Sequence, residues 1–309
     1  MKYIDFYKKK LKLKNEEDVF SFLTDNVKDS IKLFSYFINW DKVLNNVNKI
    51  EKELNLLNSL RGKENFEVEL KSLIKDSPSV IEVLPALSVR NGVNSKKFDI
   101  LVDYRRNCFR YDKFDFTSKD TSKDLLNKYY DFVNKTGTTR LFTEFKIKNF
   151  VDYMIGVEAG LDSNARKNRT GTMMEEIVGS FITDLCKKRD FKFIKQSTQK
   201  KVKDEFNKDI PIVKSEKKYD FVIYTGSNKL YVLETNFYGV GGSKLKSTAR
   251  EYIFLQNSLN KVENIEFIWI TDGIGWNTAK KPLRETFDNN DYIFNLRLLE
   301  EGILEEVVK

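Results

Sequence analysis

The sequence contains no histidine, and this absence excludes several kinds of enzyme chemistry. Ser-His-Asp and Cys-His nucleophilic catalysis, His-liganded zinc sites and histidine–metal nucleases all need an imidazole. Any catalysis must therefore depend on carboxylates, lysine, tyrosine or serine, or on a hard metal ion that is bound by oxygen atoms.

Cysteine, proline and long apolar runs are also scarce. Two cysteines, Cys108 and Cys186, in 309 residues argue against a disulfide framework and suit a reducing compartment. No apolar run approaches the roughly 20 residues of a membrane helix, and Met1 to Glu17 is charged throughout, unlike a signal peptide. We therefore expect a cytoplasmic protein that has no membrane partner.

Basic residues outnumber acidic ones, and the formal net charge is +8. Such an excess favours a polyanionic partner such as nucleic acid. A Lys-rich coding bias gives many ordinary enzymes the same balance, so the charge alone leaves both interpretations open.

The chain has two parts with different hydrophobic patterns. In the first 160 residues the apolar spacing is three to four, as in Val19–Ile38 and Leu54–Ile74, and predicts amphipathic helices. Asn91–Lys123 is polar and aromatic and predicts a short hairpin or an inserted loop. We expect a mainly helical N-terminal region over residues 1–155 that dimerises or clasps DNA, and a catalytic core over 156–309.

The second part predicts an α/β fold with a mixed sheet. Its apolar runs are short and of strand type, and they alternate with helical patterns. The expected elements are a helix at Thr170–Arg189, strands at Tyr219–Tyr224, Leu230–Phe237 and Glu266–Thr271, and a helix at Ser243–Asn260 with Ser243 as its N-cap.

Two acids interrupt the apolar strands and predict a metal site. Asp220 lies inside the first strand and Glu234 near the end of the second, although buried strands seldom carry unpaired acids. An odd-length loop between the strands sets both on one face, with Cβ atoms about 5 Å apart. Carboxylates that close repel each other unless a cation such as Mg²⁺ bridges them. The alternatives are a turn-capping Asp220 and a surface Glu234.

The residues after Glu234 predict a phosphate site. Asn236 points to the same face as Glu234, and a Gly-rich block then leads to a helix start with Lys244 and Lys246 in the first turn. Lysines there oppose the helix dipole, so a bound anion would explain them. Such glycine loops are common, and the block alone is a weak signal.

The helix at Thr170–Arg189 offers a third acid, and a polar segment precedes it. Glu175 flanks the buried face of this helix, where it either reaches the site or is an ordinary helix acid, whereas Glu176 should be solvated. Gly160–Thr170 is expected to be a polar loop, and its side chains are of types that read base edges or bind phosphates. A solvated basic loop is the alternative. The expected DNA contacts are Asn164, Arg166, Lys167, Asn168, Arg169, Ser243 and Lys246.

Three long blocks, with weaker extensions at Leu57–Leu60 and Val83–Pro85, cover most of the chain. They run through Gly156–Glu175, Phe221–Lys246 and Trp269–Phe287. In these blocks the sequence resembles the DpnII/MboI family of type II restriction endonucleases.

The resemblance implies a PD-(D/E)XK-like core, Mg²⁺, a homodimer, recognition of GATC, cleavage before the G in both strands of double-stranded DNA, and sensitivity to adenine methylation. Asp220 and Glu234 match the two motif acids. Asn236 replaces the usual lysine, which leaves Asn236, Lys244 or Lys246 to place the attacking water. A non-cleaving DNA-binding protein and a structure-selective DNA resolvase are the competing interpretations.

Overall fold

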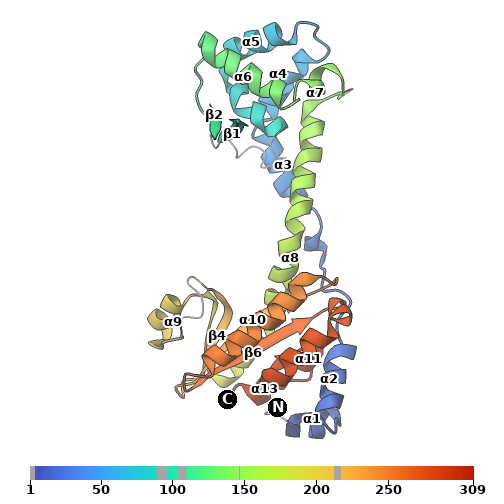
Figure 1. The fold of residues 1–309 in the computed structure, drawn as a ribbon, viewed down its shortest axis with the longest axis vertical. Helices are drawn as coiled ribbons and strands as arrows, with labels where there is room; N and C mark the ends of the chain where they lie inside the picture. The colour runs from blue at the N-terminus through green and yellow to red at the C-terminus, as the bar shows by residue number, and fades with distance from the viewer. Residues whose placement is uncertain (1–3, 89–95, 104–108, 146, 212–216) are drawn as a thin grey trace. The chain divides into compact units, whose positions relative to one another are not determined.

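The computed structural model describes residues 4–88, 96–103, 109–145, 147–211 and 217–309, and for residues 4 and 165–168 the backbone alone (Figure 1). The chain forms two compact units, and their boundary falls inside one 40-residue helix, α8 (Phe150–Arg189). One unit contains Met1–Leu33 and Lys167–Lys309, and the other contains Phe34–Arg166.

The first residues of the chain share a unit with the larger sheet. Asn295 Nδ2 donates a hydrogen bond to the Leu23 carbonyl oxygen at 3.0 Å, and the buried Asp272 carboxylate accepts one from the Lys28 backbone nitrogen at 2.6 Å. The expected division at residue 155 grouped these residues with the N-terminal helical region, whereas their contacts lie with the C-terminal half.

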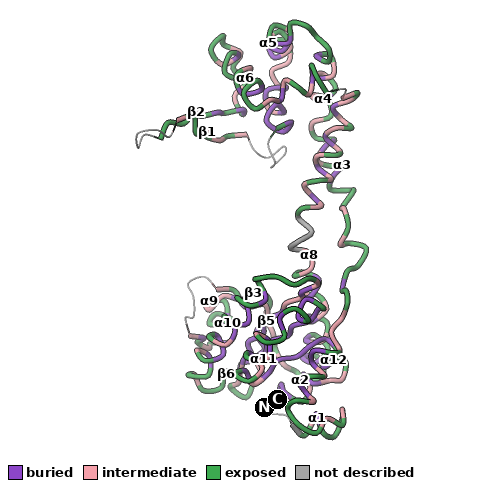
Figure 2. The backbone as a smooth tube through the Cα atoms, turned by 45° about the vertical axis from the view of Figure 1, so that its right-hand side comes forward, coloured by how far each residue is buried: buried purple, intermediate pink, exposed green. Residues whose placement is uncertain are grey.

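The larger sheet has five strands in the order β3-β4-β5-β6-β7. The pairs β3/β4 and β4/β5 are antiparallel, and β5/β6 and β6/β7 are parallel. β5 and β6 are buried along most of their length, as their nearly continuous apolar sequences require (Figure 2). This mixed sheet confirms the predicted α/β fold. The strands are β3 (Lys192–Ser197), β4 (Tyr219–Tyr224), β5 (Leu230–Phe237), β6 (Ile265–Asp272) and β7 (Ile293–Phe294).

Helices cover this sheet, and α10 packs its aromatic side chain Tyr252 against β6. The Tyr252 ring of α10 meets the rings of Phe267 and Trp269 on β6 edge to face, with centroids 5.6 and 5.0 Å apart. Among the described residues, no helix has the length and apolar character needed to cross a membrane. Besides α8, this unit contains α1 (Ile4–Leu11), α2 (Glu16–Asp25), α9 (Gln199–Phe206), α10 (Ser243–Leu259), the 3-10 helix η6 (Ile274–Thr278), α11 (Lys280–Asn289), α12 (Leu296–Glu300) and α13 (Ile303–Val307).

The other unit is helical with one antiparallel hairpin, as expected for Asn91–Lys123. Phe98 and Phe114 of the hairpin pack their rings 5.4 and 5.3 Å from that of Phe132 on α6, which anchors the hairpin to the helical core. The elements are η1 (Phe34–Tyr36), α3 (Trp40–Asn48), α4 (Glu51–Leu57), η2 (Asn58–Leu60), α5 (Phe66–Asp76), η3 (Pro78–Leu87), β1 (Lys97–Asp103), β2 (Arg110–Asp115), α6 (Lys123–Lys135) and α7 (Arg140–Thr143).

The polar loop predicted at Gly160–Thr170 is wrong, because α8 runs through this segment without a break. The side chain of Asp162 is buried, and it accepts a hydrogen bond from the Asn39 backbone nitrogen at 2.8 Å and pairs with Lys42 at 3.4 Å. These contacts stabilise the helical backbone in a segment whose composition suggested solvent exposure. Asp162 therefore has a structural partner within its own unit.

Candidate active site

The two acids predicted to bind a metal lie on neighbouring strands. β4 and β5 pair Phe221 with Leu233, and the same register continued by one residue sets Asp220 across from Glu234. The odd register that the sequence predicted is therefore confirmed. Both carboxylates belong to one face of the sheet.

The turn between β4 and β5 fixes this register. The Thr225 backbone nitrogen donates to the Lys229 carbonyl oxygen at 3.2 Å, which closes the predicted three-residue loop. Gly226 and Asn228 have positive φ angles of 77° and 70°, a conformation that glycine and asparagine tolerate better than other residues. The turn chemistry thus specifies the pairing of the acids.

Asp220 is held in one orientation by its neighbours. Its Oδ2 atom accepts hydrogen bonds from the backbone nitrogen and hydroxyl of Thr235 at 2.8 and 3.0 Å, and its Oδ1 atom accepts one from Gln196 at 3.3 Å. Burial raises the pKa of Asp220, and the two hydrogen bonds from Thr235 oppose this effect. The carboxylate is therefore fixed in position, and its hydrogen bonds offset only part of the cost of burying its charge.

Glu234 is buried, with 6% of its surface exposed. Its Oε2 atom accepts a hydrogen bond from the Tyr252 hydroxyl at 3.1 Å, whereas its Oε1 atom has no hydrogen-bond partner within the described part of the chain. Burial, followed by the nearby Asp220 charge, raises the pKa of Glu234 to about 8, and Lys217 opposes this rise. A buried carboxylate oxygen without a hydrogen bond lowers the stability of the folded protein, and it is suited to binding a cation.

Glu175 on α8 extends the carboxylate cluster. Gln196 Nε2 donates to Glu175 Oε2 at 2.7 Å and to Asp220 Oδ1 at 3.3 Å, so one amide bridges the two acids. Burial and the Asp220 charge raise the pKa of Glu175. Glu175 is half-buried and Glu176 exposed, as predicted from the helical pattern. The catalytic role of Glu175 stays a prediction.

Asn236 lies two residues beyond Glu234 on the same strand, and its amide orientation is determined. Trp269 Nε1 donates to Asn236 Oδ1 at 3.0 Å. An indole nitrogen can only donate, so the acceptor must be the amide oxygen, and the NH₂ group remains able to donate elsewhere. Asn236 can therefore position a water or a phosphate oxygen, but it cannot remove a proton.

The glycine block before α10 has a packing explanation at one position. A Cβ atom at Gly241 would collide with the Thr278 side chain of η6, whereas one at Gly242 would meet open space. The sequence predicts that these glycines let a ligand approach the backbone closely. At Gly241 the neighbour that requires glycine is instead the Thr278 side chain of η6. Gly242 is the N-cap residue of α10, and Ser243, predicted as the cap, is the first helical residue.

The remaining residues that the sequence singled out lie on helices. Lys244 and Lys246 are exposed in the first turn of α10, and Asn164 is exposed on α8. Arg169 is half-buried on α8. The side chains of the other three predicted DNA contacts, Arg166, Lys167 and Asn168, lie outside the described residues.

Four site residues escaped the sequence analysis because their contacts are long-range. Gln196 bridges Asp220 and Glu175, Thr235 and Tyr252 donate to the acids, and Lys217 lies 3.4 Å from Glu234 Oε1. One signal was present: Lys217 stands three residues before Asp220, next to the strand. Nothing local marked Tyr252, which lies mid-helix on α10.

The donor set fits a hard cation that needs few protein ligands. In the described ranges, no group of three or more His, Cys, Asp or Glu side chains is placed to hold a metal ion. Mg²⁺ commonly uses one or two carboxylates and completes its shell with water and phosphate oxygens. Asp220 and the Glu234 oxygen without a hydrogen bond satisfy that smaller requirement.

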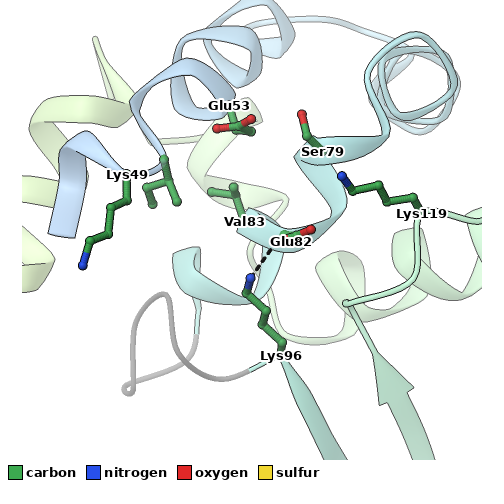
Figure 3. Close-up of a pocket in the computed structure, with 8 residues that line it drawn as sticks. Lys49, Glu53, Ser79, Glu82, Val83, Lys96 and Lys119 are labelled. Carbon is green, nitrogen blue, oxygen red and sulfur yellow. Dashed lines mark hydrogen bonds and ion pairs between the residues drawn. The ribbon is translucent and has the colours of Figure 1, made fainter.

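A separate hollow of about 480 Å³ lies in the helical unit, between η3 and the start of β1. Lys96 pairs with Glu82 there at 2.6 Å, while Lys49, Lys119, Glu53 and Ser79 also line it (Figure 3). Its charges are of both signs, and the two that meet already neutralise each other. This hollow provides no paired acids comparable to those of the sheet.

Comparison with known proteins identifies the family. The family model described as DpnII restriction endonuclease matches residues 19–306. The chain belongs to the DpnII restriction endonuclease family. It is 42% identical over 293 residues to the type II restriction enzyme MjaIII of Methanocaldococcus jannaschii, which covers 94% of this chain and 99% of that protein.

Two further relatives span nearly the whole chain. DpnII of Streptococcus pneumoniae is 34% identical, covering 95% of this chain and 98% of its own length, and MboI of Moraxella bovis is 36% identical, covering 88% and 90%. No solved structure matches the chain. Membership of the DpnII family confirms the resemblance and the prediction of a type II site-specific endonuclease.

Proposed function

We propose that this DpnII-family endonuclease uses Mg²⁺ to cut double-stranded DNA at GATC, 5′ of the G in both strands, as a cytoplasmic homodimer with a PD-(D/E)XK-like core. The observation that carries the proposal is the pair of Asp220, half-buried, and Glu234, buried, which face each other across β4 and β5 and include one oxygen without a hydrogen bond. Such a pair is stable at neutral pH when a cation binds between its members.

The sheet supports the PD-(D/E)XK assignment. An antiparallel hairpin carries the two acids, a parallel strand follows on β6, and α8 brings a further acid, Glu175, to the same place. Asn236 stands at the third motif position, where its side-chain oxygen accepts a hydrogen bond from Trp269 Nε1 and leaves its NH₂ group able to donate. The positions of the acids on the sheet, together with the family match, thus support the proposed core type.

In the proposed reaction a water gives up a proton and its oxygen bonds to phosphorus, the bond between phosphorus and the leaving oxygen breaks, and the leaving oxygen takes up a proton. Mg²⁺ held by Asp220 and Glu234 would polarise the phosphate and lower the pKa of a water. Thr235 and Gln196 orient Asp220, and Tyr252 orients Glu234. Burial raises the pKa of Tyr252, so its hydroxyl remains a donor at neutral pH. The amide of Asn236 positions the attacking water.

Two active sites related by a two-fold axis match a palindrome, whose strands have the same symmetry. We assign DNA contacts to Asn164, Arg166, Lys167, Asn168, Arg169, Ser243 and Lys246, and a phosphate contact to Lys244. The exposed first turn of α10 supports the assignment of Lys244, because free backbone N–H groups there favour anions. We also propose that the helical unit, Phe34–Arg166, dimerises or clasps DNA.

Incubation of unmethylated and adenine-methylated plasmid with the protein and Mg²⁺, followed by sequencing of the ends, tests this function. We expect discrete fragments whose ends begin at the G of GATC, and protection of the methylated plasmid. Binding without cutting would indicate a non-cleaving DNA-binding protein. Cutting at branched DNA alone would indicate a resolvase.

A further inference from the structure

Lys217 brings a positive charge to the carboxylate pair from outside the motif. Its Nζ atom lies 3.4 Å from Glu234 Oε1 and 3.4 Å from Glu251 Oε1. The Lys217 side chain is 12% exposed, and the rings of Tyr219 and Tyr252 lie 5.9 and 5.5 Å from its Nζ atom. The ammonium group is thus held among aromatic rings beside the metal-binding acid.

The geometry of this contact is that of a loose pair. Charge-assisted hydrogen bonds between nitrogen and carboxylate oxygen are about 2.7–2.9 Å long, and both Lys217 distances are longer. Glu234 Oε1 has no hydrogen bond although Lys217 is its neighbour. A lysine that served only to neutralise Glu234 would be expected to form a short bond. The ammonium group is therefore shared between Glu234 and Glu251 without a short bond to either carboxylate.

The location of Lys217 matches a missing group. Asn236 occupies the third motif position and carries no charge, so the developing charge on a phosphate lacks a cationic side chain from that position. Lys244 and Lys246 are exposed on α10, whereas Lys217 is largely buried and in contact with Glu234. An ammonium group with fewer water contacts stabilises a nearby negative charge more strongly.

We propose that Lys217 supplies the ammonium group that the third motif position lacks: it lies beside Glu234 before metal and DNA bind, and it then contacts a non-bridging oxygen of the scissile phosphate. This proposal rests on the proposed function for the identity of the substrate. Within the free protein it rests on the contacts of Lys217 alone.

This double role has a consequence that a purely structural lysine would not share. In the free protein, a cation next to Glu234 repels a metal ion, so its removal should strengthen metal binding. In the DNA complex, the same removal takes away a charge that stabilises the reacting phosphate, and the chemical step should slow. Metal affinity and cleavage rate are thus expected to change in opposite directions.

The test compares Lys217→Met, which keeps the aliphatic stem, with Lys217→Arg, which keeps the charge. Mn²⁺ binding to the DNA-free protein is measured by electron paramagnetic resonance, since Mn²⁺ accepts the same oxygen ligands as Mg²⁺. Single-turnover cleavage of prebound DNA is measured at saturating Mg²⁺. For Lys217→Met we expect a tighter Kd for Mn²⁺ and a cleavage rate lower by about 100-fold or more.

Lys218→Met is the matched control, because Lys218 is the exposed neighbour in the sequence and should leave both measurements unchanged. Lys217→Arg should retain the wild-type Mn²⁺ affinity. A cleavage rate for Lys217→Met within threefold of wild type, or a large loss found in Lys244→Met instead, would overturn the proposal. A joint loss of Mn²⁺ affinity, rate and Tm in Lys217→Met would also overturn it and indicate a structural ion pair.

The metal titration keeps this result separate from the proposed function. If the wild-type protein cuts no DNA, the proposed function fails, while the Mn²⁺ affinities still report whether Lys217 opposes the cation. An unchanged Mn²⁺ Kd in Lys217→Met overturns the role of Lys217 even when the wild type cuts GATC.

Discussion

The indole of Trp269 donates its N–H to the side-chain oxygen of Asn236 at 3.0 Å, and this contact fixes which end of the amide faces the site. Removal of the Asn236 amide in Asn236→Ala should lower single-turnover cleavage by about 100-fold, as for other positioned donors. Trp269→Phe leaves the amide in place but free to rotate, so a smaller loss is expected.

Trp276→Phe is the matched control for this prediction. Trp276 is as deeply buried and donates its indole N–H to Thr271 Oγ1 at 2.9 Å. Both Trp→Phe variants lose one hydrogen bond in the core and should lower Tm similarly. Equal cleavage rates for Trp269→Phe and Trp276→Phe would show that the orientation of Asn236 does not matter.

The acid pair is expected to be essential for chemistry and dispensable for DNA binding. Asp220→Asn and Glu234→Gln should each abolish cleavage, while Kd for a GATC duplex in Ca²⁺ stays near the wild-type value. Asp272→Asn is the control: Asp272 is fully buried and accepts backbone hydrogen bonds from Lys28, Gly273 and Leu296. It should lose stability and keep the cleavage rate of the folded fraction. Undiminished cutting by either site variant would remove that acid from the site.

The raised pKa of Glu234 makes the metal-free protein less stable at high pH. The unfolded acid has a pKa near 4.5 and the folded one a pKa of about 8, so the folded state binds the extra proton between these values. The associated stability is complete below the lower pKa and is lost as the pH rises through the upper one. At pH 8.5, metal-free Glu234→Gln should therefore be more stable than wild type, by about 1–3 kcal/mol, and at pH 4 the two should agree.

Mg²⁺ should reverse this difference, because a ligand that binds the folded state alone stabilises it, by about 2.7 kcal/mol at 100 times its Kd. Thermal unfolding at both pH values, with and without Mg²⁺, provides the measurement. A Glu234→Gln variant whose Tm rises with Mg²⁺ as much as that of wild type would show that the cation binds elsewhere.

Gln196 combines an unfavourable backbone conformation with a bridging side chain. Its φ is +47°, in the left-handed region, and its amide joins Glu175 to Asp220. Asparagine adopts this backbone readily but is one methylene shorter and cannot span both acids. Gln196→Asn should therefore keep Tm and lower the cleavage rate about tenfold. The control is Gln199→Asn. This variant should lose the hydrogen bond from Gln199 Nε2 to the Pro211 carbonyl oxygen and keep the cleavage rate of wild type.

The basic segment of α8 gives a prediction about DNA affinity. Arg166→Ala, Asn168→Ala and Arg169→Ala should each weaken binding. A base reader would lose about 1–3 kcal/mol for GATC and relax one position of the site. A phosphate contact would weaken binding to all duplexes alike and flatten the salt dependence of Kd. Titrations of GATC and scrambled duplexes at several salt concentrations separate these outcomes, and unchanged affinity in all three variants would place the segment off the interface.

The sequence alone determined three of the five strands of the larger sheet, the odd hairpin register and the acids that face each other. Strand side chains alternate with a period of two, so an odd loop between Tyr224 and Leu230 leaves Asp220 and Glu234 on one face whatever else packs there. The buried side of α8 followed from helical periodicity in the same way. The family blocks added the class of enzyme.

Only the tertiary structure decided how the acids are held. The side chains that donate to the site come from distant positions: Tyr252 lies 18 residues from Glu234, Gln196 lies 24 from Asp220, and Trp269 lies 33 from Asn236. No local pattern encodes such contacts. The composition around Asp162 predicts a loop. It does not reveal that the Asp162 carboxylate accepts a hydrogen bond from the Asn39 backbone nitrogen, far away in the sequence, and is buried there on a continuous helix. Likewise, the helix start after the glycine block favoured Lys244 as the cation that serves the site, and that role stays a prediction, whereas only the structure shows the Lys217 Nζ atom 3.4 Å from Glu234 Oε1. Packing between distant elements sets the local dielectric and the distance between charges, and these two quantities fix which charged group lies beside the acids.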